Sequence, residues 1–262
     1  MKAFVLKRLL LSAGISALAA SAVIPAACAQ AEPAGQAAAQ GYVMPETEVW
    51  DMIAANGETY RIYVSRPEGE PPEGGYPVLY VLDGNAIFGG FAETRRLLEG
   101  SDVGKSIIVG VGYPTDKAYD MRRLYDLTGG PPPPPWDATL GKERSGGWNE
   151  FLAFLTGELR TEIGARYTIN PDRQALFGHS LGGLFAIHAL FSRPDAFHAI
   201  IAASPSLFWH KDMLKAERDF SARLQAGKIS KVSRLMVVAG ELEEVALERW
   251  DAEAFVKRME PL

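Results

Sequence analysis

The segment Gly178-His179-Ser180-Leu181-Gly182-Gly183 contains the strongest chemical signal in the sequence. Its Gly-x-Ser-x-Gly spacing lies between an apolar run that ends at Gly178 and another that begins at Leu184. The bare pattern fits an ordinary glycine-rich turn, but between a strand and a helix it predicts a tight turn whose glycines leave room for a strained serine. We therefore expect Ser180 to be a nucleophile, with the Leu181 amide stabilising an oxyanion at the start of the helix.

Alternating strand and helix patterns surround this segment and are expected to position it. The first two strand patterns alternate polar and apolar residues around an Asn56-Gly57 turn, which predicts an antiparallel hairpin, whereas the later ones are apolar on both faces, as in central parallel strands. The predicted strands are Glu46–Asp51, Thr59–Val64, Pro77–Leu82, Ser106–Val111, Gln174–Gly178, Ala199–Ala203 and Leu235–Ala239, and the predicted helices are Phe91–Glu99, Trp148–Arg166, Leu184–Phe191, Lys211–Gln225 and Leu247–Arg258. This order favours an α/β fold with a mostly parallel sheet and helices on both faces.

A long insertion, Tyr113–Gly147, interrupts the alternation. It contains Gly129-Gly130 and the run Pro131–Pro135, which neither a helix nor a central strand accommodates. We expect a long loop, and such loops inside compact domains are usually functional or mobile.

The totals favour one globular domain that does not bind nucleic acid. The chain has 262 residues, 47% of them hydrophobic, which is enough for a sizeable core. The net charge is -5, and no stripe of lysine and arginine could neutralise a phosphate backbone.

The N-terminal residues fit an export signal. Lys2, Lys7 and Arg8 precede an apolar run that ends at the small-residue site Ala27-Cys28-Ala29. This pattern predicts a signal peptide at 1–29, a flexible leader at 30–41 and a domain at 42–262, in a periplasmic or secreted protein without a membrane span. Cys28 is the only cysteine, so a mature chain would have no disulfide, although lipid anchoring at Cys28 is a less favoured alternative.

Three segments together resemble one family. They are Tyr80-Val81-Leu82-Asp83-Gly84-Asn85 with Phe88, then Gly178–Gly183, then Ala203-Ser204-Pro205-Ser206-Leu207-Phe208-Trp209. In this order and spacing they resemble the esterase branch of the α/β-hydrolases that includes the bacterial siderophore esterases, which cleave trilactone siderophores. The resemblance extends from about Tyr42 to the end of the chain, and it implies an α/β-hydrolase fold.

The resemblance implies roles for residues after the strand Pro77–Leu82. The loop there supplies the second oxyanion-hole amide in this fold, from Gly84 or Asn85, and we favour Asn85. Asp83 and Asn85 could also form a purely structural turn, which is compatible with that role. Phe88 and Trp209 are expected to contact substrate, as members of a set of loop aromatics that either lines an acyl pocket or packs the loops. That set is Phe88, Tyr113, Trp136, Trp148, Phe208 and Trp209.

The resemblance also implies an acid after the strand Leu235–Ala239. Glu243 matches best, with Glu241 and Glu244 as alternatives, while the competing interpretation is a solvated helix start. No histidine follows these residues in the sequence given.

Four histidines are candidates for the base. His179, His188 and His198 are expected to be structural, and His210 comes before the acid, contrary to the family order. We therefore expect the domain to lack its last strand, histidine loop and last helix. The chain is then either a truncated esterase, which we favour, or a natural homologue that has lost its base.

The sequence thus predicts a serine-dependent carboxylic ester hydrolase that forms an acyl-enzyme, with a small-molecule ester such as a siderophore-like lactone as substrate. It predicts no cofactor and no metal. The alternative is a catalytically impaired binding protein that uses the same pocket, and the sequence leaves the oligomeric state open.

Overall fold

The computed structural model describes residues 41–210, 212–240 and 252–259. The predicted signal peptide and residues 30–40 of the predicted leader lie outside the described residues, and the main folded unit begins at Val43. No helix in the described ranges is long and apolar enough to cross a membrane.

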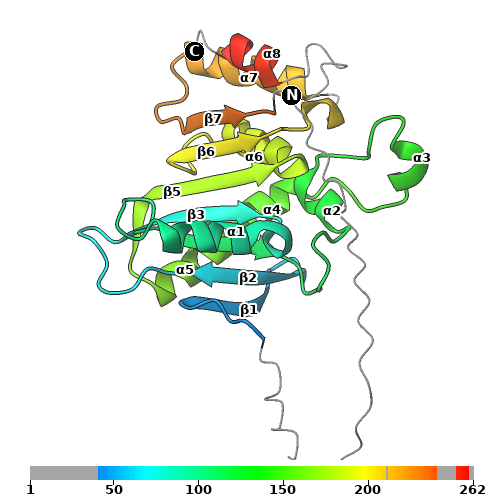
Figure 1. The fold of residues 1–262 in the computed structure, drawn as a ribbon. Helices are drawn as coiled ribbons and strands as arrows, with labels where there is room; N and C mark the ends of the chain where they lie inside the picture. Colours follow the sequence, from blue (N-terminus) through cyan, green and yellow to red (C-terminus); the bar gives the residue numbers. More distant parts are fainter. Residues whose placement is uncertain (1–40, 211, 241–251, 260–262) are drawn as a thin grey trace, which may run out of the picture. The chain divides into compact units, whose positions relative to one another are not determined.

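A seven-stranded sheet forms the centre of the described fold, in the order β1-β2-β4-β3-β5-β6-β7 (Figure 1). The strands are β1 Thr47–Ile53, β2 Thr59–Ser65, β3 Tyr76–Leu82, β4 Ile107–Gly112, β5 Ile169–His179, β6 Ala199–Ala203 and β7 Arg234–Val238. β2 runs antiparallel to both β1 and β4, and all other neighbours are parallel. The predicted opening hairpin and mostly parallel sheet are confirmed.

Helices cover both faces of the sheet (Figure 1). α1 (Gly84–Leu97) lies on one face over β3 and β4, and α4 (Trp148–Phe154), α5 (Arg160–Arg166) and α6 (Leu181–Ser192) lie on the other. A π-helical turn at Leu155–Leu159 joins α4 to α5, so the predicted helical stretch is continuous. α7 (Met213–Gln225) packs against α6, and α8 (Ala252–Met259) contacts β7.

Two hydrophobic clusters correspond to the two faces. A large cluster lies between the sheet and the helices α4, α5 and α6. A small cluster made of Val81, Phe88, Ala92 and Ile108 lies between the sheet and α1. All six residues of β4 are buried, which explains why that strand is apolar on both faces. These layers hold the carboxyl ends of β3 and β5 rigidly in place.

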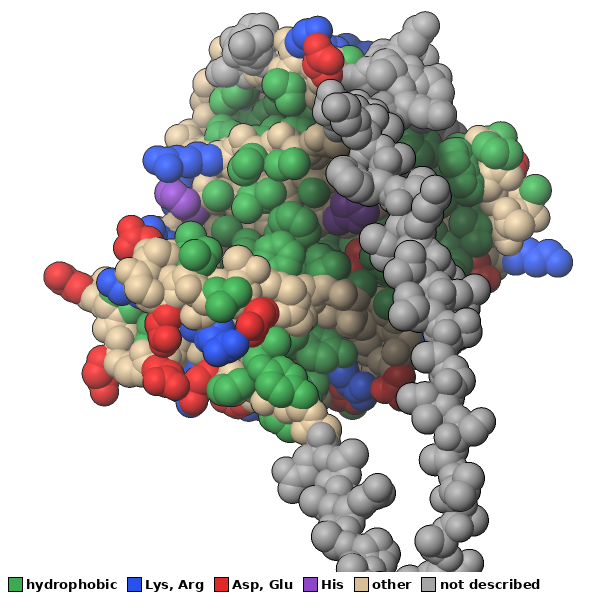
Figure 2. Space-filling view, viewed as in Figure 1, with side chains coloured by type: hydrophobic (Ala, Val, Ile, Leu, Met, Phe, Trp, Pro, Cys, Tyr) green, Lys and Arg blue, Asp and Glu red, His purple; other side chains and the backbone are tan. Residues whose placement is uncertain are grey.

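Part of the α1 face of the sheet is apolar without a described helix over it. Figure 2 shows hydrophobic side chains gathered over β5, β6 and β7. Phe177 of β5 contacts Phe91 of α1, and it is in register with Ile201 of β6, which is in register with Met236 of β7. Residues in register point to the same face, so this row continues from α1 to the exposed Met236.

The insertion is more ordered than the expected loop. It contains two short helices, α2 (Arg123–Leu127) and α3 (Asp137–Leu140). α2 packs against α4 and α6 and buries Leu124 and Leu127, whereas α3 projects away from the sheet (Figure 1). Helices of four or five residues are too short to produce a recognisable 3.6-residue period, so the sequence pattern could not reveal them.

Candidate active site

Ser180 is the single residue between β5 and α6. Its backbone angles are φ 58° and ψ -114°, a conformation that costs a non-glycine residue about 1 to 3 kcal/mol. A Cβ atom at Gly178 would lie 2.0 Å from the carbonyl oxygen of Gly182, so only glycine fits there. The predicted tight strand-to-helix turn is therefore present, with backbone strain concentrated at Ser180.

Backbone hydrogen bonds hold this turn. The Ser180 N–H donates to the carbonyl oxygen of Ala203 at 3.0 Å. The Ser180 carbonyl oxygen accepts from the N–H groups of Leu184 at 3.0 Å and Ser206 at 3.1 Å. The half-buried Ser180 hydroxyl lies 3.3 Å from the hydroxyl of Ser206, a contact that the sequence pattern did not suggest.

Leu181 is the first residue of α6, and the helix is buried from Leu181 to Phe191. The first N–H groups of a helix have no acceptor within it, and they carry the positive end of the helix dipole. The buried surroundings lower the local dielectric, which strengthens an interaction with a developing negative charge. Leu181 therefore has the position expected of an oxyanion-hole donor.

Asp83 forms a second strand-to-helix turn, between β3 and α1. It adopts the left-handed conformation, with φ 54° and ψ 44°. Its carboxylate accepts two hydrogen bonds from the guanidinium of Arg123, one from Nε and one from Nη2, both at 2.8 Å. Both side chains are nearly buried, with 4% of Asp83 and 14% of Arg123 exposed. The insertion therefore supplies the counter-charge for this turn.

Asn85 is the second residue of α1, and its side chain forms hydrogen bonds to the start of the insertion. Its Nδ2 donates to the carbonyl oxygens of Tyr113 at 2.9 Å and Thr115 at 2.8 Å, and its Oδ1 accepts from the Tyr113 N–H at 2.7 Å. A Cβ at Gly112 would lie 2.1 Å from that Oδ1. Because the second N–H of a helix has no intrahelical acceptor, the Asn85 amide can still serve an oxyanion.

The two turns meet at one edge of the sheet. β3 and β5 are neighbouring parallel strands, with Val81 in register with Phe177. A Cβ at Gly182 would lie 3.5 Å from Oδ2 of Asp83, so the Asp83 carboxylate contacts the start of α6. Ligands of open α/β sheets bind at this edge, beyond the carboxyl ends of the strands. The geometry brings the Leu181 and Asn85 turns together beside Ser180.

The two predicted substrate-contacting aromatics lie in different places. Trp209 ends a 3-10 helix, Leu207–Trp209, and its ring centroid lies 5.8 Å from that of Trp136 in the insertion. Trp136 also stacks on Phe208 at 5.1 Å. Phe88 instead lies on the side of α1 that faces the sheet, where its ring stacks on that of Tyr63 with the centroids 5.3 Å apart. This burial favours a packing role for Phe88.

Glu241, Glu243 and Glu244, the candidates for the acid, lie outside the described residues. The strand that precedes them, β7, ends at Val238 and is in parallel register with β6, so its carboxyl end faces the same edge as Ser180. The choice among the three glutamates stays a prediction.

The histidines differ in their surroundings. His179 and His198 are exposed. His188 is buried on α6, stacked on Trp148 at 3.7 Å and hydrogen-bonded to Asn149 at 3.0 Å. Burial, with a smaller contribution from nearby His210, lowers the pKa of His188 to about 3, so this ring is neutral at physiological pH. His210 follows the 3-10 helix and packs edge-on against Trp148 at 4.6 Å.

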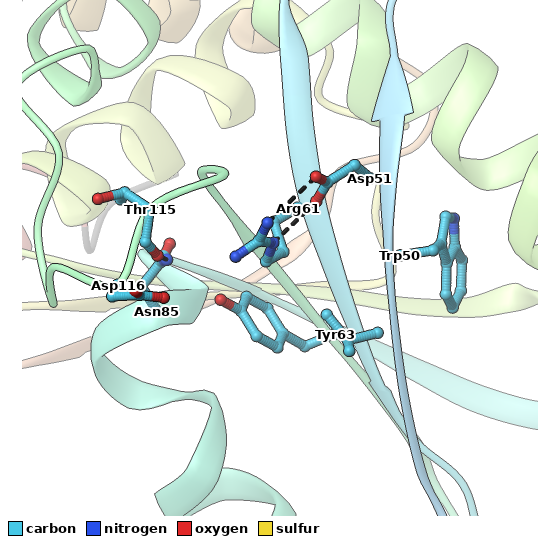
Figure 3. A pocket seen from close by; sticks show the side chains of 8 residues that line it. Trp50, Asp51, Arg61, Tyr63, Asn85, Thr115 and Asp116 are labelled. Carbon is cyan, nitrogen blue, oxygen red and sulfur yellow. Dashed lines mark hydrogen bonds and ion pairs between the residues drawn. The ribbon is translucent and has the colours of Figure 1, made fainter.

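A pocket of about 570 Å³ has Asn85 in its lining but not Ser180 (Figure 3). It is lined by Val49, Trp50, Asp51, Arg61, Tyr63, Asn85, Thr115 and Asp116. Arg61 is paired with Asp51 through Nε at 2.8 Å and Nη2 at 3.1 Å. Within the described part of the chain, no group of three or more His, Cys, Asp or Glu side chains is arranged to hold a metal ion.

Proteins with similar sequences and structures carry esterase names. The sequence pattern of the family described as "Putative esterase" matches residues 53–260. The ferri-bacillibactin esterase BesA of Bacillus subtilis is 37% identical over 215 residues, which cover 78% of this chain and 73% of that protein. The siderophore triacetylfusarinine C esterase of Aspergillus fumigatus is 40% identical over 176 residues, covering 64% of this chain and 58% of that protein, less than two thirds of its length.

Solved structures agree with these sequence matches. The crystal structure of the BES protein from Bacillus cereus has a TM-score of 0.70 and 34% identity, and the match covers 85% of this chain and 82% of that chain.

Proposed function

This chain belongs to the esterase family whose pattern matches residues 53–260, and we propose that it hydrolyses carboxylic esters through an acyl-enzyme formed on Ser180. The observation that carries the proposal is the backbone of Ser180, which is held at φ 58° between the central strand β5 and the amino terminus of the buried helix α6. A strained serine at such a turn is the arrangement that exposes a nucleophile to substrate.

In the proposed reaction, Ser180 Oγ attacks the ester carbonyl carbon while a base accepts its proton. The amides of Leu181 and Asn85 donate hydrogen bonds to the oxyanion of the tetrahedral intermediate. Collapse of the intermediate expels the alcohol, and water then hydrolyses the acyl-Ser180 ester. We propose Glu243 as the acid that orients the base. No step requires a metal or an organic cofactor.

The proposed substrate is a siderophore-like ester. Support comes from the two relatives above, which are named a ferri-bacillibactin esterase and a siderophore triacetylfusarinine C esterase. The aromatic contacts among Trp136, Phe208 and Trp209 provide apolar surface beside the loop that carries Ser206, which suits a substrate bulkier than acetate. The signal-like N-terminus supports a periplasmic or secreted enzyme.

Hydrolysis of p-nitrophenyl acetate and butyrate by the chain from Gln30 onward tests the ester hydrolase proposal. A cyclic trilactone siderophore, with ring opening followed by mass spectrometry, tests the substrate. We expect turnover by the wild-type chain and none above background for Ser180→Ala. If the wild-type rate equals that of Ser180→Ala in a folded sample, the catalytic proposal is wrong and a binding function replaces it.

His210→Ala in the same assay identifies the base. Because His210 follows β6 at the edge where Ser180 lies, it is the one described histidine whose chain position allows this role. Activity that survives His210→Ala assigns the proton transfer to another group, and activity lost as completely as in Ser180→Ala assigns it to His210.

A further inference from the structure

The hydroxyl of Ser206 is the side-chain group that the structure places against the nucleophile. Its Oγ lies 3.3 Å from Ser180 Oγ. Among the described residues, this contact is the one hydrogen bond that either hydroxyl makes. Each hydroxyl has one proton and two lone pairs, so only one of the two can donate in this contact.

The loop that carries Ser206 is fixed from several sides. The Ser206 N–H donates to the Ser180 carbonyl oxygen at 3.1 Å, and the Ser206 carbonyl oxygen accepts from the Trp209 N–H at 3.0 Å. A Cβ at Gly183 would lie 2.9 Å from Cα of Pro205, so the loop packs directly on the start of α6. Ser206 therefore keeps its position relative to Ser180 without help from its own hydroxyl.

The direction of the hydroxyl contact follows from the reaction. If Ser180 donated to Ser206, its proton would point away from the base that must remove it. If Ser206 donates, the Ser180 proton is free to point at the base. The hydrogen bond then strengthens as negative charge develops on Ser180 Oγ, and interactions that strengthen in the transition state raise kcat.

We propose that Ser206 is a positioning residue whose hydroxyl donates to Ser180 Oγ, which orients the nucleophile and its proton for attack. This inference deepens the proposed esterase function and rests on it. The separation of 3.3 Å is longer than a typical hydroxyl hydrogen bond, and catalytic hydrogen bonds without substrate are often long and shorten in the reacting complex.

Ser206→Ala removes the hydroxyl and keeps both backbone hydrogen bonds. With p-nitrophenyl butyrate we expect kcat to fall about 10-fold, the effect of losing one hydrogen bond of ordinary strength, while KM changes less than about twofold. Labelling of Ser180 by a fluorophosphonate should slow by a similar factor. The fraction of molecules labelled at completion should stay at the wild-type value.

Two controls separate positioning from folding. Ser206→Thr retains a hydroxyl and should keep kcat within about threefold of wild type. Ser101→Ala removes an exposed hydroxyl that bonds the carbonyl oxygen of Leu98 at 2.7 Å, far along the chain from Ser180, and it should leave kcat unchanged. The melting temperature of each variant is measured alongside.

The inference is wrong if Ser206→Ala keeps kcat within twofold of wild type. It is equally wrong if the alanine and threonine variants lose the same activity, or if the loss matches a reduced labelled fraction. A wild-type chain no faster than Ser180→Ala would instead overturn the proposed function, and the role of Ser206 with it.

Discussion

The two turns beside the candidate site share a positive φ at a non-glycine residue, but they differ in ψ and in what supports them. Ser180 follows β5 with φ 58°, and Asp83 follows β3 with φ 54°; each is a non-glycine residue that leads directly into a helix. The Ser180 turn is held by backbone hydrogen bonds and by glycines packed against carbonyl groups. The Asp83 turn is held by side chains, through the Asp83–Arg123 ion pair and the amide group of Asn85.

This difference shows which residues of the sequence specify each turn. The glycines that allow the Ser180 turn lie within three residues of it, so a local pattern specifies it. The partners of the Asp83 turn are distant, because Tyr113 is 28 residues from Asn85 and Arg123 is 40 residues from Asp83. The Asp83 turn thus depends on the insertion. Substitutions in the insertion should therefore displace the Asn85 amide of the proposed oxyanion hole.

Ser180→Ala should give the largest effect, because it removes the nucleophile and leaves both turns in place. We expect kcat for p-nitrophenyl butyrate to fall on the order of 10³-fold or more. The measurement is steady-state hydrolysis, with circular dichroism to show that the fold persists. Retention of more than a tenth of the activity would exclude Ser180 as the nucleophile.

Arg123→Met tests the side-chain support of the Asp83 turn. It leaves the Asp83 carboxylate buried without its counter-charge, which should lower the free energy of unfolding by about 3 kcal/mol. The matched control is Arg96→Met, which breaks a similar two-point ion pair with Glu93 on an exposed surface and should cost less than about 1 kcal/mol. Urea unfolding of both variants measures the contrast, and equal losses would contradict it.

Asn85→Ala tests whether the insertion positions the oxyanion hole. It removes three hydrogen bonds to Tyr113 and Thr115 and keeps the backbone amide. We expect kcat to fall about 10-fold with little change in KM, because the misplaced amide matters most in the transition state. Burst kinetics locate the loss in acylation or deacylation. Unchanged kcat would show that the Asn85 side chain does not support the oxyanion hole.

Asp126→Asn tests a buried contact between the insertion and β2. Asp126 is fully buried on α2 and accepts a hydrogen bond from the Tyr60 hydroxyl at 2.9 Å. Burial raises the pKa of Asp126 from 3.8 to about 6, so the folded protein holds this proton more tightly than the unfolded chain.

The sign of the pH dependence follows from that difference. Below about pH 4 both states are protonated and the extra stability is present, and it is lost as the pH rises towards 6. The pH-dependent loss should be on the order of 2 kcal/mol, and Asp126→Asn should remove it. Urea unfolding from pH 4 to pH 7 compares the two proteins. Parallel pH profiles would contradict the assignment.

Ser180→Gly should give the smallest effect and sharpen the comparison. Glycine adopts φ 58° without strain, so this variant should be about 1 kcal/mol more stable than Ser180→Ala. Asp83→Gly should be less stable than wild type, because it removes the ion pair along with the strain. Thermal unfolding should therefore give a higher melting temperature for Ser180→Gly than for Ser180→Ala, and a lower one for Asp83→Gly than for wild type.

The sequence predicted the sheet and the Ser180 turn well because both depend on local patterns. All seven predicted strands are present, although β5 begins at Ile169, five residues before its predicted start, and α6 follows Ser180 as expected. The start of α1 was predicted too late, at Phe91 instead of Gly84, because Gly84, Gly89 and Gly90 weaken the helical pattern and Asp83 offers an unusual left-handed start.

The contacts that sequence could not predict are those between distant loops. Nothing in the separate segments indicates that Arg123 pairs with Asp83 or that Trp136 stacks on Phe208. The Ser206 contact was within the recognised Ala203–Trp209 segment, but its role depends on the distance to Ser180. Phe88 was expected to contact substrate as one of the loop aromatics at the carboxyl ends of strands, whereas it lies in α1, which turns that side chain towards Gly110 and the sheet.

Trapping of the acyl-enzyme tests the central claim most directly. The chain is mixed with excess p-nitrophenyl butyrate, quenched in acid during the burst, digested and mapped by mass spectrometry. The account predicts a butyryl group on Ser180, absent from Ser180→Ala and removed on further incubation. Steady turnover without an adduct on Ser180, or with the butyryl group on another residue, would contradict it.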